Sequence, residues 1–145
     1  MNILLKSKYA KYSKKLDDLD YEFSRLIEQC RIDLAELQYL PLNEHKQNRC
    51  KNVLQEIISR CRREKVDVER GNLIIKEAIK SFDKDSLGII NVIEPVKDII
   101  RHGSKHAKEL KNVQGQVLAS FTKENLREKA IVEKIHANDD IERNI

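Results

Sequence analysis

Apolar residues recur along the first part of the chain at alternating spacings of four and three residues. This row consists of Leu5, Tyr9, Tyr12, Leu16, Leu19, Phe23, Leu26, Cys30, Asp33, Leu37 and Leu40. Only Asp33 is polar, and no glycine or proline interrupts the row. A repeat of about 3.5 residues is the coiled-coil period, because it keeps one side of an α-helix facing a partner helix. The pattern therefore predicts a long helix over about residues 4–39.

A second row follows Pro41 with the same spacing. It consists of Cys50, Leu54, Ile57, Cys61, Glu64, Val68, Gly71, Ile75, Ala78 and Phe82. Because a helix usually ends at or before the residue that precedes a proline, residues 40–43 are predicted to turn, and Asn43 can cap the next helix. We therefore expect a second helix over about residues 44–82. Gly71 lies in its middle, either as a flexible point or where another backbone approaches closely.

The distribution of charge favours an antiparallel hairpin of these two helices. Acidic residues predominate over residues 17–45, and basic residues predominate over residues 46–65. Folding the chain back at Pro41 lays the acidic segment along the basic one, and flanking charges of opposite sign set the orientation of paired helices. The first row could also pair with a second copy, so the pattern allows a monomer or a homodimer.

A third row occupies the remainder of the chain but contains helix-breaking residues. It consists of Ile89, Ile93, Val96, Ile100, Gly103, Ala107, Leu110, Gln114, Val117 and Phe121. Pro95 and Gly103 predict a kinked or broken helical segment over residues 87–136, with the break near Gly103–Ser104. Alternatively, Pro95 is the first residue of a helix, and residues 89–93 are extended. The polar tail, residues 137–145, is predicted to fray.

Together these rows predict an all-α fold with a single elongated helical domain over residues 1–136. A long, coiled-coil-like hairpin (residues 4–82) carries the third segment on its surface. The composition agrees, since 36% of residues are charged, 5% are aromatic and none is tryptophan. No apolar run is long enough to cross a bilayer or to direct export, and an odd number of cysteines favours the reducing cytoplasm.

Asp33 is the first candidate for a special role. It could fix the register of the hairpin as a buried polar residue, with Lys51 or Asn52 opposite, or it could lie on a partly exposed part of the row near the turn. The cysteines fit no zinc-binding spacing and are predicted to be small buried apolar residues. They are Cys30, Cys50 and Cys61.

A possible metal site consists of Asp98, His102 and His106, which share one face of a helix at intervals of four residues. Histidines at this spacing can hold zinc, but no glutamate stands where a zinc hydrolase needs its base, and a solvated face explains the same pattern. We therefore predict no metal and no cofactor. Without a P-loop, a nucleophile elbow, a C-x-x-C pair or a glycine-rich dinucleotide turn, the sequence does not predict an enzyme.

Three basic clusters are candidate interaction sites in a chain with a net charge of +4. Such clusters bind phosphates in some proteins, and in others they are solvated faces that pair with acidic helices. The amino-terminal cluster consists of Lys6, Lys8, Lys11, Lys14 and Lys15. The middle cluster consists of Arg60, Arg62, Arg63 and Lys65, and the third cluster consists of Arg101, Lys105, Lys108 and Lys111.

The long rows and the absence of an active-site motif favour a non-enzymatic helical protein–protein interaction module, such as a stalk, adaptor or small chaperone. Its expected partners are one or more proteins that bind through helix faces. The alternative is a helical protein that binds nucleic acid through the lysine and arginine clusters. In architecture, size and charge, residues 5–82 resemble the coiled-coil stalk proteins of type III secretion and flagellar export ATPases. No motif residue carries that resemblance, and the third segment departs from a two-helix stalk.

Overall fold

A computed structural model describes residues 3–82 and 90–143 of the chain, and the side chains of residues 6–80, 93–121 and 123. The described backbone forms three helices: α1 (Ile3–Leu37), α2 (Glu44–Phe82) and α3 (Ile90–Arg143). Each helix packs against the other two. The prediction of an all-α fold is therefore confirmed. None of the described helices contains a stretch apolar enough to span a membrane.

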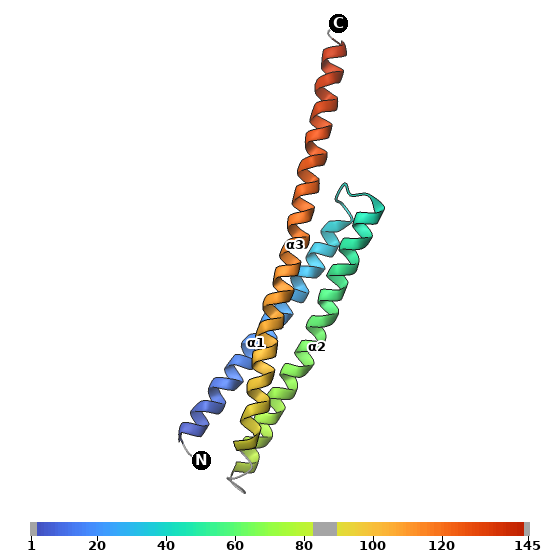
Figure 1. Ribbon diagram of the computed structural model, residues 1–145. Coiled ribbons are helices and arrows are strands. Elements are labelled where there is room, and N and C mark those ends of the chain that lie inside the picture. Colours follow the sequence, from blue (N-terminus) through green and yellow to red (C-terminus); the bar gives the residue numbers. More distant parts are fainter. Residues whose placement is uncertain (1–2, 83–89, 144–145) are drawn as a thin grey trace.

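The turn between α1 and α2 follows from local signals around Pro41. Backbone hydrogen bonds from Tyr39 N–H to the carbonyl oxygen of Glu36 (3.0 Å) and from Leu40 N–H to that of Leu37 (3.2 Å) close α1. The side chain of Asn43 accepts a hydrogen bond from the backbone N–H of Lys46 (2.8 Å), which confirms Asn43 as the N-cap of α2. Figure 1 shows α2 returning alongside α1 from this turn.

The three predicted rows form the core. Leu16, Phe23 and Cys30 of α1 are completely buried, as are Leu54 and Cys61 of α2. From α3 the buried apolar residues of the third row are Val96, Ala107, Leu110 and Phe121. Full burial of a leucine or phenylalanine side chain contributes about 1.5–3 kcal/mol, so each fully buried residue of these rows stabilises the bundle.

The break predicted near Gly103–Ser104 is wrong, because α3 is one helix through this region. A Cβ at Gly103 would lie 3.0 Å from Cδ1 of Leu19, and one at Gly71 would lie 3.1 Å from Cδ2 of Leu16. The two glycines therefore let leucines of α1 approach α2 and α3 closely. Their cost in helix propensity, about 1 kcal/mol each, is offset by this packing.

The amino-terminal part of α3 also differs from one of the alternatives. Residues 90–93 are helical rather than extended, and Pro95 lies inside the helix instead of at its first position. Residues 87–89 lie outside the described residues. Pro95 lies in the second turn of α3, so its missing N–H removes one hydrogen bond near the amino-terminal end of the helix. Its side chain is exposed.

The carboxy-terminal part of α3 extends beyond the other two helices. Figure 1 shows α3 passing the α1–α2 turn and continuing as a single helix. It ends at Arg143, farther along the chain than the end expected near His136. We refer to residues 122–143 as the α3 extension.

Candidate interaction site

A buried carboxylate joins α1 to α3. Asp33 is 1% exposed and is the only charged side chain that is buried among the described residues. Its Oδ1 accepts a hydrogen bond from Gln29 Nε2 (3.0 Å) and its Oδ2 accepts one from Gln114 Nε2 (2.8 Å). The burial rules out a partly exposed position, and the partner expected across the hairpin is wrong, since Lys51 and Asn52 are exposed. The partner of Asp33 is instead Gln114, which belongs to the third row and lies on α3, outside the α1–α2 hairpin.

Glu64, the polar residue of the second row, also has a polar partner on α3. Glu64 of α2 lies 2.5 Å from Nδ1 of His106 on α3, and this contact is only partly exposed. Each helix of the hairpin thus has one polar residue in its apolar row, and α3 supplies a partner to each. These two contacts fix the axial position of α3 on the hairpin, because an apolar row alone tolerates a shift by one heptad.

Two of the three cysteines are inert core residues, as predicted. Cys30 and Cys61 are completely buried. Burial raises the pKa of the Cys30 thiol to about 12, with a further contribution from Asp33, and raises the pKa of the Cys61 thiol to about 11. Cys50 is only half-buried, and burial raises its pKa as well. All three are free thiols.

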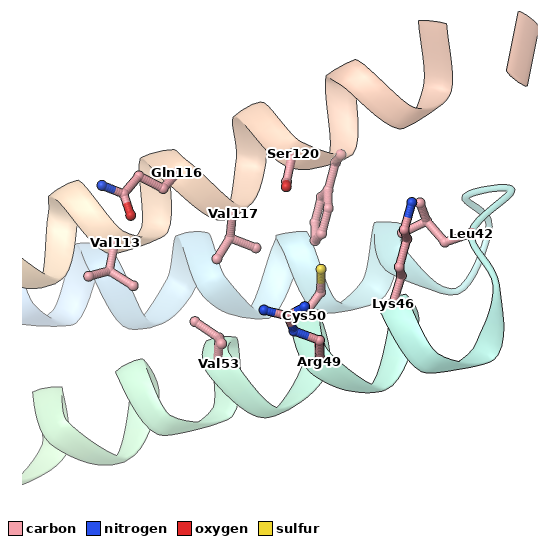
Figure 2. Close-up of a pocket in the computed structure, with 10 residues that line it drawn as sticks. Leu42, Lys46, Arg49, Cys50, Val53, Val113, Gln116, Val117 and Ser120 are labelled. Atoms are coloured by element: carbon pink, nitrogen blue, oxygen red, sulfur yellow. The ribbon is translucent and has the colours of Figure 1, made fainter. Parts of the chain in front are cut away.

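An apolar groove lies between α2 and α3 next to the α1–α2 turn. The groove has a volume of about 360 Å³. Figure 2 shows its lining side chains, which come from α2, from α3 and, for Leu42, from the turn. The lining residues are Leu42, Lys46, Arg49, Cys50, Val53, Val113, Gln116, Val117, Ser120 and Phe121. Val53 and Val113 on its walls are 36% and 37% exposed. Among the lining residues that the structure describes, two are basic and none is acidic.

The middle and third basic clusters are partly neutralised by neighbouring acids. Arg60 and Arg63 both lie 3.4 Å from Glu56, and Arg101 lies 2.7 Å from Asp98. Two further ion pairs link different helices: Lys65 with Asp20 of α1 (4.0 Å) and Lys111 with Glu22 of α1 (3.3 Å). Arg62, Lys105 and Lys108 are exposed. These pairs agree with the interpretation of the clusters as solvated, helix-pairing faces.

The amino-terminal cluster differs from the other two. All five of its lysines are exposed on α1. Within the described part of the chain no acidic side chain forms an ion pair with them. This cluster therefore presents its positive charge to solvent.

The possible metal ligands do not converge. The rings of His102 and His106 have centroids 6.3 Å apart, while Asp98 accepts a hydrogen bond from Arg101 (2.7 Å) and His106 is paired with Glu64. Among the residues that the structure describes, no group of three or more histidine, cysteine, aspartate or glutamate side chains could hold a metal ion.

The groove is the feature that sequence reasoning missed. Its apolar residues come partly from the predicted rows (Cys50, Val117 and Phe121) and partly from beside them (Val53 and Val113). A wide apolar stripe on the second helix was the available signal, since such a stripe indicates contact with more than one neighbour. Comparisons with protein-family models, with curated proteins and with solved structures gave no match to this chain.

Proposed function

We propose that this chain is a non-enzymatic helical protein–protein interaction module that receives a helix of its partner in the groove between α2 and α3. The observation that carries the proposal is the exposure of the apolar groove walls at Val53 and Val113. An amphipathic helix binds such a groove by inserting apolar residues at helical spacing. A fourth helix laid there would complete a four-helix arrangement around the end of the core.

This proposal includes a role as an adaptor or stalk in the cytoplasm. Three unpaired cysteines, two of them buried, suit a reducing compartment. Most residues lie in three long helices, and polar pairs link these helices. Such a structure suits a rigid element that holds its partners at a fixed distance.

The test is capture of partners from an extract of the native host with three forms of the full chain. Val113→Glu places a charge on the groove wall, and Val66→Glu is the matched control, since Val66 is 65% exposed on α2 and does not line the groove. We expect the wild type and Val66→Glu to retain the same protein partner after nuclease treatment, and Val113→Glu to lose it. Equal capture by all three forms would refute a partner site at the groove.

A second candidate function is nucleic-acid binding, which the five exposed lysines of the amino-terminal cluster favour. Binding to phosphates releases counterions, so affinity should fall steeply with added salt. A gel-shift titration at low salt with duplex and single-stranded probes tests this function, and Lys8→Glu combined with Lys15→Glu should abolish any shift. Absence of a shift at low salt would remove the candidate.

A further inference from the structure

The α3 extension lacks support from α1 and α2. Asp33 lies beside Gln114, and α1 ends at Leu37, so the end of α1 is level with the groove and the rest of α3 passes beyond it. Figure 1 shows α3 continuing past the end of α1. The extension is about 30 Å long, at about 1.5 Å per residue. Because most helical stability in proteins comes from packing, a helix of this length without neighbours gains stability when a partner covers it.

The groove and the extension belong to the same helix. Val113, Val117 and Phe121 line the groove, and the extension begins at the next residue. One copy of α3 thus contributes a groove wall and a projecting helix in direct succession. When two copies approach antiparallel about a two-fold axis, each extension meets the groove of the other copy. Such a pairing is closed, because both sites of both copies are filled.

The charges favour the antiparallel direction. Residues 131–143, the last part of the extension, include four acidic and two basic residues in the sequence. Two of the acidic residues, Asp139 and Asp140, are adjacent. Among the described lining residues of the groove, Arg49 and Lys46 are basic and none is acidic. An antiparallel approach brings the acidic end of one copy toward the basic groove of the other. The same segment contains Ile131, Ile135 and Ile141 in its sequence, which supply apolar surface for burial.

We infer that the helix received by the groove is the α3 extension of a second copy, so that the chain forms a closed antiparallel homodimer through α3. This inference rests on the proposed function and names the partner at the same site. The dimer buries two groove contacts, and it covers both projecting helices with the apolar walls around Val53 and Val113.

The first experiment measures the mass of the full chain in solution by sedimentation equilibrium. We expect a reversible dimer with a mass near twice the 17.0 kDa of one chain. Val113→Glu should weaken association about tenfold or more, which corresponds to about 1.4 kcal/mol, while Val66→Glu should not change it. Ala130→Pro, which breaks the backbone of the extension, should also weaken association and leave the bundle folded by circular dichroism.

Mixing two defective variants tests reciprocity. Val113→Glu retains an intact extension, and Ala130→Pro retains an intact groove, so an equimolar mixture can form one of the two contacts. We expect a mixed dimer that is weaker than the wild-type dimer but stronger than either variant alone. The Cys50 thiol in the groove gives an independent measurement, since its reaction with a disulfide reagent should slow as protein concentration rises in the wild type and not in Ala130→Pro.

Three other outcomes would each overturn the proposed homodimer. A wild-type monomer whose partner capture depends on Val113 would leave the proposed function standing with a different protein in the groove. A monomer whose capture does not depend on Val113 would remove both. A dimer that neither Val113→Glu nor Ala130→Pro weakens, or open association into larger species, would mean that the copies meet at another surface.

Discussion

The contact between Asp33 and Gln114 gives the sharpest test of how α3 is held on the hairpin. Asp33 is buried and accepts two hydrogen bonds, of which Gln114 donates the shorter at 2.8 Å. Gln114→Leu removes this donor and leaves only Gln29 on the carboxylate. Hydrogen bonds to charged groups contribute about 1.5–3 kcal/mol, so we expect the free energy of unfolding to fall by about that amount.

The Asp33→Leu variant and the Asp33→Leu/Gln114→Leu double variant should differ in their free energies of unfolding. Asp33→Leu leaves the amide of Gln114 without its acceptor, which costs about 1–3 kcal/mol, although the desolvation cost of the carboxylate is also removed. In the Asp33→Leu/Gln114→Leu variant neither polar group remains, and two apolar side chains can pack in their place. Replacement of a buried polar pair by apolar residues is often neutral or stabilising. We therefore expect the double variant to lie within about 1 kcal/mol of the wild type, or above it.

The assay is urea unfolding followed by far-ultraviolet circular dichroism at one fixed protein concentration, with the slope checked for each variant. Gln55→Leu on the exposed face of α2 is the matched control and should change stability by less than about 0.5 kcal/mol. Single-variant costs that simply add in the double variant would refute the coupling of Asp33 with Gln114. A Gln114→Leu variant as stable as the control would refute the importance of the hydrogen bond itself.

Three further predictions concern the glycines and the cysteines. Gly115→Ala should raise the free energy of unfolding by about 1 kcal/mol, because a Cβ there meets nothing within 4 Å. Gly103→Ala should not show this gain, because its Cβ would lie 3.0 Å from Leu19 of α1. Equal gains for the two variants in urea unfolding would contradict the close packing of Gly103 against α1. In the folded chain Cys50 should react with a disulfide reagent before Cys30 and Cys61, whose thiols are buried and have raised pKa values; mass mapping of the modified peptides checks the order. The same raised values imply that stability falls as pH rises above the usual thiol pKa of 9.0, since the thiols of the unfolded chain ionise first, and Cys30→Ala should reduce that fall.

The helices themselves could be predicted from the sequence because their signals are local. The spacing of apolar residues identified the buried face of each helix, and Pro41 with Asn43 located the turn and the start of α2. Hydrogen bonds of a helix run between neighbours in the chain, so period and capping residues largely determine where helices occur.

The path of α3 could not be predicted in the same way. Gly103 has a low helix propensity, and from its neighbours alone it indicates a break. The side chain of Leu19, far away in the sequence, fills the space that a Cβ would need, and this packing keeps the helix continuous. The groove also depends on where α3 crosses α2, and no spacing along one helix contains that information.

The polar residues of the rows carry the missing information when they are compared between helices. Asp33 in the first row and Gln114 in the third form one contact, and Glu64 in the second row is paired with His106 beside the third. The match between Asp33 and Gln114, the polar residues of the first and third rows, therefore indicates where α3 lies on the hairpin. The same match determines how much of α3 projects: with residue 114 held beside residue 33, and α1 ending at Leu37, the helix that continues to Arg143 must pass the turn. A shift of α3 by one heptad toward its amino terminus would shorten the extension but would leave Asp33 without an acceptable partner. The buried carboxylate thus fixes the length of helix that projects beyond the α1–α2 turn.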